Sequence, residues 1–326
     1  MKENANLNGF GRFGLHLLYY YLDRATESKF EITHINDDSL SIDQIMHSIL
    51  NDSYVRLREK WEITHSQNLV IFTNGENRYQ IQISNLALPE FVVNKTGILL
   101  ECSGKYTNIE NLQYCDNLKR VYISATSLNA DSTLIVGFNE SNYMNQHKFI
   151  SYGSCTVNAF IPLANSLHTQ FKVIESDVNV IHNIPEYKLR TIPDIFERRD
   201  CTLSFMAPKL LNFINLENFN VNYTIVPITG VSRIDFRFKM VHDFEINSVI
   251  KCIDSINNKF GNKLYKIHEN DPGPYEAILS DYSAEFVLEQ TRKVGDNIYL
   301  SAYFDTENSV NRYYDLINSI ERVNLN

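Results

Sequence analysis

One cysteine and one histidine give the strongest indication of chemistry in this sequence. Cys155 stands in a turn of small residues, just ahead of a predicted helix that starts at about Val157, and His182 lies 27 residues later on a predicted strand. The dipoles at a helix N-terminus favour a thiolate, which is the nucleophilic form of cysteine. A returning strand can bring the imidazole beside the head of that helix. The spacing therefore predicts covalent catalysis by Cys155 with His182 as its general base.

The other cysteines and histidines are interpreted as structural residues. Free cysteines are mostly small core side chains, and an odd number of cysteines without close pairs indicates neither a disulfide framework nor a zinc site. We therefore expect a reduced cytoplasmic setting and no bound metal. The residues assigned in this way are Cys102, Cys115, Cys201 and Cys252, with His16, His34, His47, His65, His147, His168, His242 and His268.

A glycine-rich turn near the start of the chain predicts a dinucleotide site. Gly9, Gly11 and Gly14 form the spacing G-x-G-x-x-G between a predicted strand, residues 5–10, and an amphipathic helix. Such glycines allow the backbone to approach a pyrophosphate closely, at a helix N-terminus that attracts anions. Asp37 ends the next predicted strand, where a carboxylate can bind the ribose hydroxyls and repel a 2′-phosphate. The predicted cofactor is NAD, and the alternative is a structural glycine turn followed by an unrelated acid.

Hydrophobic patterning predicts an α/β chain of two domains. Residues 1–154 are expected to form a Rossmann NAD-binding domain with a mostly parallel sheet, completed by a C-terminal helix at 308–326. Residues 155–307 are expected to form an α+β catalytic domain with a mostly antiparallel sheet. Pro162 is expected in the first turns of a helix, where proline is tolerated. The predicted strands are 5–10, 30–35, 69–72, 79–83, 97–101, 119–124, 134–136, 149–151, 171–184, 221–226, 232–241, 276–278 and 298–304, with further helices at 157–170 and 244–260.

Composition argues against several classes of partner. The chain of 326 residues has a net charge of −9 and a pI of about 5.5, which disfavours a broad surface for nucleic-acid phosphates. No apolar run reaches the length of a membrane span, and the opening residues lack the pattern of a secretory signal. We expect a cytoplasmic protein that binds neither nucleic acid nor membrane.

Several segments, taken in order along nearly the whole chain, resemble signatures of the glyceraldehyde-3-phosphate dehydrogenase family. Residues 8–14, NGFGRFG, resemble the family's NGFGRIG, and residues 35–37 keep its IND. Residues 151–158, SYGSCTVN, resemble its catalytic thiol motif SNASCTTN, and the spacing from cysteine to histidine is also the family's. Further similarities are ECSGKYT at 101–107, ISATS at 123–127, Val226-Pro227, Val231-Ser232, Asp235 and Asn311-Arg312.

The resemblance implies NAD-dependent oxidation of a small-molecule aldehyde through a thioester. Cys155 would attack the aldehyde to form a thiohemiacetal, His182 would take the proton, and the main-chain N–H of Cys155 could serve in an oxyanion hole. Phosphate or water could then resolve the thioester. The family also implies a homo-oligomer, either a tetramer or a dimer. The other implied site residues are Gly9, Gly11, Arg12 and Phe13 at the pyrophosphate, Asp37 at the ribose, Ser124 at the nicotinamide, and Ser154 and Thr156 at the substrate.

The departures from the family mainly concern a phosphate on the substrate. Ile225 stands where the family has an arginine that holds the distal phosphate, and an apolar side chain cannot replace a cation beside a buried phosphate. The span from His182 to Ile225 is also shorter than in the family, in a loop that normally meets a neighbouring subunit. We therefore expect an aldehyde other than glyceraldehyde 3-phosphate. Further departures are Pro185 and Tyr187 for two threonines, residues 204–209 for the S-T-G-A phosphate loop, Ser84-Asn85 for an arginine that flanks adenine, and 302–307 for W-Y-D-N-E.

Two alternatives stand beside this enzyme. Loss of the phosphate-binding residues and a polar first strand also fit a catalytically degraded family member that binds a nucleotide or a protein partner. A glycolytic dehydrogenase acting on the family's own substrate is the other. Arg198 and Arg199 could restore an anion site, although adjacent arginines are usually solvated surface residues. The presence of both Cys155 and His182 favours the enzyme.

Overall fold

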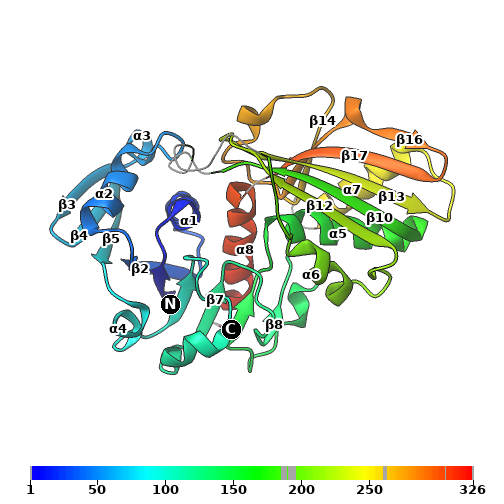
Figure 1. The fold of residues 1–326 in the computed structure, drawn as a ribbon. Helices are drawn as coiled ribbons and strands as arrows, with labels where there is room; N and C mark the ends of the chain where they lie inside the picture. The colour runs from blue at the N-terminus through cyan, green and yellow to red at the C-terminus, as the bar shows by residue number, and fades with distance from the viewer. Residues whose placement is uncertain (1, 185–188, 190–195, 260–262, 305, 325–326) are drawn as a thin grey trace. The chain divides into compact units, whose positions relative to one another are not determined.

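The chain is described from a computed structural model, which covers residues 2–184, 189, 196–259, 263–304 and 306–324 (Figure 1). It divides into two compact units. The first consists of Met1–Leu134, Ser141–Gly153 and Tyr313–Asn326, and the second of Ile135–Glu140 and Ser154–Arg312. The sequence-based division at 154/155 did not separate the short segment Ile135–Glu140, and it began the C-terminal part of the first domain at 308.

The first unit is built on a nine-stranded sheet in the order β3-β4-β5-β2-β1-β6-β7-β9-β8. Neighbouring strands are parallel from β5 to β8, whereas β3, β4 and β5 form an antiparallel meander. The strands β6 and β7 are buried at every position, as parallel strands in the middle of a sheet usually are. The strands are β1 Glu3–Asn8, β2 Phe30–Asn36, β3 Glu62–Ser66, β4 Leu69–Asn74, β5 Asn77–Ser84, β6 Ile98–Glu101, β7 Arg120–Ile123, β8 Ser132–Thr133 and β9 Phe149–Ser151.

Among the helices of this unit, α2 is stabilised by a capping box, and the C-terminal helix is held by a buried ion pair. Helix α2 begins with a capping box, in which Ser41 accepts a hydrogen bond from the N–H of Gln44 and the Gln44 side chain accepts one from Ser41. In the C-terminal helix, buried Glu321 accepts hydrogen bonds of 2.7 and 2.5 Å from the guanidinium of Arg120. The helices are α1 Arg12–Asp23, α2 Ile42–Asn51, α3 Leu57–Lys60, α4 Leu88–Val92, η1 Ile109–Cys115, η2 Glu140–Asn142 and, from Tyr313 onward, α8 Thr306–Asn324.

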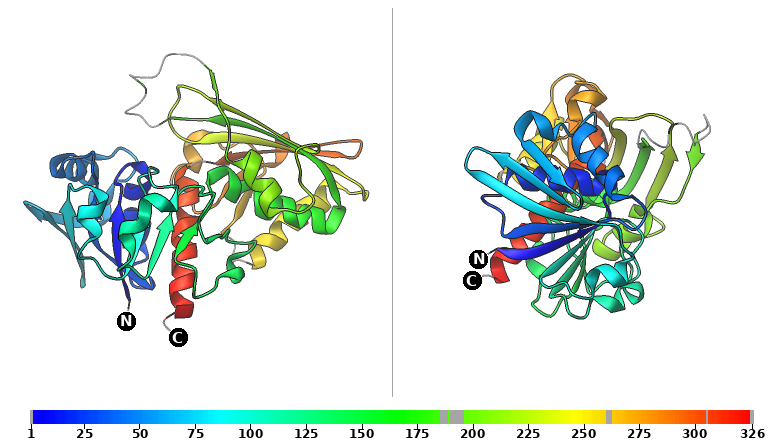
Figure 2. Two further views of the ribbon diagram at one scale, coloured as in Figure 1. Left: turned by 60° about the horizontal axis from the view of Figure 1, so that its bottom comes forward. Right: turned by 90° about the vertical axis from the view of Figure 1, so that its left-hand side faces the viewer.

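The second unit contains an eight-stranded, mostly antiparallel sheet in the order β11-β12-β10-β13-β17-β15-β14, with β16 paired to β17. In β13 every second side chain is buried, and these apolar residues pack with helix α5 in one core. Figure 2, in its left view, shows α5, α6 and α7 on one side of the strands. The elements are α5 Cys155–Phe171, β10 Val173–His182, β11 Glu197–Arg198, α6 Leu203–Leu210, β12 Phe219–Ile225, β13 Ser232–Met240, α7 Ile246–Lys259, β14 Tyr265–His268, η4 Pro274–Ala277, β15 Ala284–Val287, η5 Leu288–Gln290, β16 Arg292–Val294 and β17 Asn297–Phe304.

Pro162 lies in the interior of α5 rather than in its first turns, because the helix begins at Cys155. A proline in the interior disturbs the hydrogen-bond ladder around it. Here the hydroxyl of Tyr265 enters the ladder: it accepts a hydrogen bond from the N–H of Leu163 and donates one to the carbonyl of Ala159, each 3.0 Å long. A side chain of the same core thus satisfies the two backbone groups that would otherwise bond to each other.

The structure corrects two predicted strands and bears out the α/β class. The predicted strand at 134–136 is wrong, since the short strand β8 precedes it at Ser132–Thr133, and the predicted strand at 276–278 overlaps the 3₁₀-helix η4. Short apolar runs do not separate strands from buried turns. The alternation rule also missed β15, Ala284–Val287, because its Glu285 is buried like its apolar neighbours. Among the described residues, no helix is long and apolar enough to cross a membrane.

Candidate functional site

Cys155 and His182 lie side by side in the second unit. Cys155 is the first residue of α5, Ser154 caps this helix by accepting a hydrogen bond from Val157, and His182 is the last residue of β10. The Sγ atom of Cys155 lies 3.8 Å from Nε2 of His182. Both residues are half-buried. The packing of α5 against β10 thus brings together the two side chains singled out by their spacing.

A second contact defines which nitrogen of His182 carries its proton. Nδ1 of the ring lies 2.7 Å from the main-chain oxygen of Asn183. Because a carbonyl oxygen only accepts, Nδ1 must be the donor, and in the neutral ring Nε2 is then the acceptor. The lone pair of Nε2 therefore faces the thiol, which is the tautomer that a general base needs.

Three hydroxyl groups surround the head of α5. Ser154 Oγ lies 3.2 Å from Thr156 Oγ1, and Thr202 donates a hydrogen bond of 3.0 Å to Ser154 Oγ. Ser154 and Thr156 were predicted site residues, but Thr202 was missed. The only local signal was a threonine directly before the helix α6, although its side chain does not cap that helix.

Cys201 is a second thiol near this cluster, with its Sγ atom 3.6 Å from Thr156 Oγ1. Burial raises the pKa of the Cys201 thiol. A buried, protonated thiol is a poor nucleophile, so the structural interpretation of Cys201 stands.

Aromatic rings enclose the imidazole. The ring of Tyr223, on β12, lies 5.4 Å from that of His182 between centroids, and the ring of Phe304, on β17, meets it edge-on at 6.0 Å. Tyr223 was not anticipated, because its place depends on the pairing of β12 with β10. These rings restrict the orientation of the imidazole.

The residues considered for binding a substrate phosphate are placed as follows. Ile225 ends β12 and is 8% exposed. Arg199 forms a bidentate contact with Glu197, with both distances 2.8 Å, and Arg198 donates to side chains of β12. Both arginines are therefore engaged by surface neighbours in their own sheet. Pro185 and Tyr187 lie outside the described residues.

In the first unit, the glycine turn has a shape that side chains would not allow. Gly9 has φ +91°, and a Cβ atom there would overlap the main chain of Ser103; one at Gly14 would overlap the carbonyl of Gly9. Gly11 differs, because a Cβ atom would meet nothing within 4 Å. Gly11 is also the N-cap of α1, and no side chain caps this helix. The N-terminus of α1 thus fits an anion in the open space before it.

Arg12 and Phe13 begin α1 with different surroundings. The guanidinium of Arg12 lies 5.7 Å from the ring centre of Tyr54. The side chain of Phe13 packs edge-on against Tyr152 and Tyr313, with centroid distances of 5.7 and 5.3 Å. Its ring is a core side chain, so any contact of Phe13 with a pyrophosphate would use its main-chain amide.

Asp37 joins the end of β2 to the glycine turn. One carboxylate oxygen accepts a hydrogen bond of 2.7 Å from the N–H of Phe10, and the other accepts bonds of 2.8 Å from Ser39 and Leu40. A carboxylate has about four acceptor positions, so a ribose hydroxyl could use only the position that these three donors leave open. This structural role was not foreseen beside the predicted cofactor contact.

A buried carboxyl, Glu101, lies at the carboxyl end of β6 and was also missed. It accepts hydrogen bonds from the Asn8 side chain at 2.7 Å and the Ser103 main chain at 2.8 Å. Burial raises the pKa of Glu101 from 4.5 to about 7, although these donors oppose the shift. Nearby, Ser124 follows β7 and its main-chain N–H donates to the carbonyl of Glu101.

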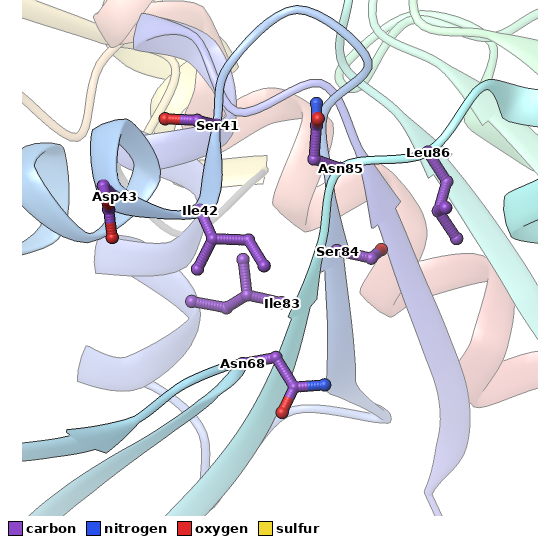
Figure 3. A pocket seen from close by; sticks show the side chains of 8 residues that line it. All are labelled: Ser41, Ile42, Asp43, Asn68, Ile83, Ser84, Asn85 and Leu86. Atoms are coloured by element: carbon purple, nitrogen blue, oxygen red, sulfur yellow. The ribbon is translucent and has the colours of Figure 1, made fainter.

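A pocket of about 510 Å³ opens where β5 ends and α2 begins (Figure 3). Figure 3 shows Ile42 and Ile83 turned toward one another, with polar side chains around them. Asn85 shapes the rim by donating to the carbonyls of Asp37 and Leu40 at 2.7 and 3.0 Å. The lining residues are Ser41, Ile42, Asp43, Asn68, Ile83, Ser84, Asn85 and Leu86.

These features define a class of protein. A parallel-rich, Rossmann-like sheet whose first turn leads into an uncapped helix is combined with a second, mostly antiparallel unit that carries a thiol–imidazole pair. The chain is therefore a two-unit α/β protein with a Rossmann-like sheet in one unit and a thiol–imidazole pair in the other.

Comparison with known proteins agrees with this class. Over 191 residues, 56% of the chain, it is 29% identical to glyceraldehyde-3-phosphate dehydrogenase 2 of Caenorhabditis elegans and 30% identical to glyceraldehyde-3-phosphate dehydrogenase 3.1 of Caenorhabditis briggsae. Over 185 residues, 54% of the chain, it is 26% identical to the glyceraldehyde-3-phosphate dehydrogenase of Thermotoga maritima. No family model matches the chain. The chain spans about half the length of the curated relatives it matches. Over this part the chain is similar to glyceraldehyde-3-phosphate dehydrogenases at 26–30% identity.

Proposed function

We propose that the chain is an NAD-dependent aldehyde dehydrogenase that forms a thioester at Cys155. The observation that carries this proposal is the 3.8 Å approach of the Cys155 thiol to Nε2 of His182, with Nδ1 of the same ring donating to Asn183. The similarity to glyceraldehyde-3-phosphate dehydrogenases supports the same class of reaction. A thiol, an acceptor nitrogen and a helix N-terminus together supply an activated nucleophile.

The chain's own residues would act in sequence. His182 takes the thiol proton at Nε2, and the thiolate of Cys155 attacks the carbonyl carbon of the aldehyde to form a thiohemiacetal. The main-chain N–H of Cys155, at the head of α5, can stabilise the developing oxyanion. The chemistry that NAD would supply, when bound, is a hydride acceptor. The oxyanion takes up the proton from Nε2 of His182; as hydride leaves, this proton returns to Nε2 and the acyl group remains on Cys155 as a thioester.

The acyl acceptor would enter beside the three hydroxyl groups. Ser154 Oγ accepts a hydrogen bond from Thr202 and can donate its own proton to an incoming water or phosphate, since a hydroxyl both donates and accepts. Transfer of the acyl group to either nucleophile returns the thiolate. Because Thr202 adds a hydroxyl that the sequence analysis did not include, the structure favours phosphate as the acyl acceptor more than the sequence did.

The residues of the first unit fit the cofactor. The amides at the N-terminus of α1, beyond Gly11, suit a pyrophosphate, and Asp37 has acceptor capacity for a ribose hydroxyl. A carboxylate there disfavours a 2′-phosphate, which is the reason to propose NAD rather than NADP. The pocket lined by Ile42 and Ile83 is suited to a flat apolar base such as adenine.

The substrate class follows from β12. Ile225 is a poor partner for a phosphate because burying an unpaired phosphate is costly. We therefore propose a small aldehyde whose tail carries no phosphate. From the resemblance to glyceraldehyde-3-phosphate dehydrogenases we also propose a homo-oligomer. Light scattering of the purified chain measures its mass in solution.

The test is formation of NADH by the purified chain with a panel of aldehydes, with and without phosphate groups. We expect turnover of unphosphorylated aldehydes that is lost in Cys155→Ala. Cys252→Ala is the matched control, because Cys252 is a buried thiol of α7 and should not affect turnover. Unchanged turnover in Cys155→Ala, or none with any aldehyde in the parent chain, would refute the proposal. Efficient oxidation of glyceraldehyde 3-phosphate would refute the substrate class alone.

A second candidate is a nucleotide-binding protein without turnover. It is favoured by Ile225, which offers no cation to a substrate at the end of β12, whereas the uncapped N-terminus of α1 keeps open space for an anion. Calorimetric binding of NAD without NADH formation, together with Cys155 alkylation no faster than that of a free cysteine, would support it.

A further inference from the structure

The segment that follows His182 is clamped to the start of β13, and this clamp bears on the imidazole. Asn183 is 4% exposed and Ser232 is 1% exposed, so both lie in the interior. The N–H of Asn183 donates to Ser232 Oγ at 3.0 Å, and Ser232 Oγ donates to the side-chain oxygen of Asn183 at 3.1 Å. The side-chain amide of Asn183 also donates to the carbonyl of Gly230. Every polar atom of the Asn183 side chain is thus used.

The one remaining polar group of Asn183, its carbonyl, is the acceptor of the His182 Nδ1 proton. The direction of that carbonyl is set by the peptide plane between Asn183 and Ile184. The clamp fixes one side of this plane, and the hydrogen bond from the N–H of Ile184 to the carbonyl of Ile228, at 2.9 Å, fixes the other. The carbonyl therefore has little freedom to turn away from the ring.

We propose that Asn183 is a positioning residue that selects the reactive tautomer of His182. With the carbonyl held in place, the ring keeps its proton on Nδ1 and offers Nε2 to the Cys155 thiol. When the thiol proton moves to Nε2, both ring nitrogens carry protons, and the hydrogen bond to the carbonyl becomes charge-assisted. The clamp thus favours the thiolate–imidazolium pair as well as the tautomer that precedes it.

This inference rests on the thiol–imidazole pair of the proposed function but not on NAD or an aldehyde. The test is therefore the rate of Cys155 alkylation by iodoacetamide as a function of pH, without cofactor or substrate. The other four cysteines are buried, and Cys155→Ala provides the background rate. Failure of the proposed dehydrogenase would appear in the NADH assay and would leave this measurement intact.

Asn183→Ala should slow alkylation at pH 6.5 by about fivefold to tenfold, the range expected for one net hydrogen bond. At pH 9, above the ordinary thiol pKa of about 8.5, the thiolate forms without help from the imidazole, so the rates should agree within about twofold. Ser232→Ala should act in the same direction. The double variant should be no slower than either single variant, because the two residues form one clamp.

Asn179→Ala is the matched control, since Asn179 is an exposed asparagine of β10, the strand that ends directly before Asn183. It should leave the pH profile unchanged. An Asn183→Ala profile that coincides with the parent profile would overturn the proposal. Equal slowing at pH 6.5 and pH 9, or a profile moved by Asn179→Ala as well, would also overturn it, because such effects indicate general loosening of the fold.

Discussion

The thiol site of the second unit and the glycine turn of the first unit obtain their geometry in different ways. At the thiol site, side chains from α5 and β10 meet, and what matters is which atoms they carry. At the glycine turn, the main chain itself forms the surface, and what matters is the absence of side chains at Gly9 and Gly14. One site is specified by the functional groups present and the other by the atoms that are missing.

This difference explains which parts of each site can vary. Around the thiol pair, the side chain of Ile225 can change without removing the pair, because the pairing of β12 with β10 holds the main chain in place. Around the turn, Asp37 and Asn8 are tied into hydrogen bonds that hold the backbone. Changes there are expected to affect folding first and ligand binding second, whereas changes at the thiol site should affect chemistry first.

The largest effect that would test this comparison is expected from Gly9→Ala. A Cβ atom at Gly9 would overlap the main chain of Ser103, and the φ of +91° is strained for alanine. We expect a loss of about 3–5 kcal/mol in unfolding free energy, combining backbone strain with overpacking. Urea denaturation of both proteins measures it.

Two further glycines make this prediction specific. Gly75→Ala, at φ +59° with open space around it, should cost only about 1–2 kcal/mol. Gly11→Ala should leave stability within about 1 kcal/mol of the parent, because φ is ordinary and the space is open, yet it should weaken NAD binding. If Gly11→Ala binds NAD as well as the parent does, the pyrophosphate does not lie at the head of α1.

The second effect concerns Glu101, whose pKa is raised to about 7 by burial. The folded state favours the protonated carboxyl, so its stabilisation is complete below pH 4.5 and is lost as the pH rises through 7. Relative to Glu101→Gln, the parent protein should lose up to about 3 kcal/mol of unfolding free energy between pH 4.5 and pH 8.

Denaturation midpoints of the parent and Glu101→Gln across this pH range measure the difference. A constant offset is expected from altered hydrogen bonds to Asn8, so only the slope with pH is informative. Parallel pH profiles would show that Glu101 is ionised in the folded protein and that its burial does not lower the unfolding free energy at high pH.

The same contrast explains what the sequence could predict. The turn at Gly9 and Gly11 and the place of Asp37 at the end of β2 could be predicted from spacing, because a turn and the strand that follows it impose local constraints; their role at a cofactor stays a prediction. Cys155 and His182 are found because a helix and its returning strand join them. The parallel-rich sheet and the mostly antiparallel sheet follow from the change in hydrophobic patterning.

What the sequence did not predict depends on contacts between elements that are distant along the chain. Thr202 reaches Ser154 from α6, and Tyr223 reaches His182 from β12. The proposed positioning role of Asn183 depends on its hydrogen bonds with Ser232 on β13. A threonine, a tyrosine and an asparagine have no distinctive spacing, so only the pairing of strands and the packing of helices reveal them.

The smallest effect, and the one that separates chemistry from packing at the thiol site, is expected from Thr202→Val. Valine keeps the shape of threonine but removes the hydroxyl that donates to Ser154. Release of the acyl group from Cys155 should slow by about fivefold, as expected for one lost hydrogen bond. Alkylation of Cys155 should not change, because the thiol–imidazole pair does not involve Thr202. Rapid-quench measurement of the acyl-enzyme, with water or phosphate as acceptor, gives the rate.

Thr169→Val is the control for this last change, since Thr169 lies exposed near the other end of α5 and donates to a carbonyl of its own helix. If Thr202→Val slows acyl release only in the presence of phosphate, phosphate is the nucleophile that the hydroxyl cluster binds. A slower rate with water alone would indicate hydrolysis. An acyl-enzyme that decays equally fast in Thr202→Val and the parent would mean that the hydroxyl cluster caps α5 and takes no part in resolving the thioester.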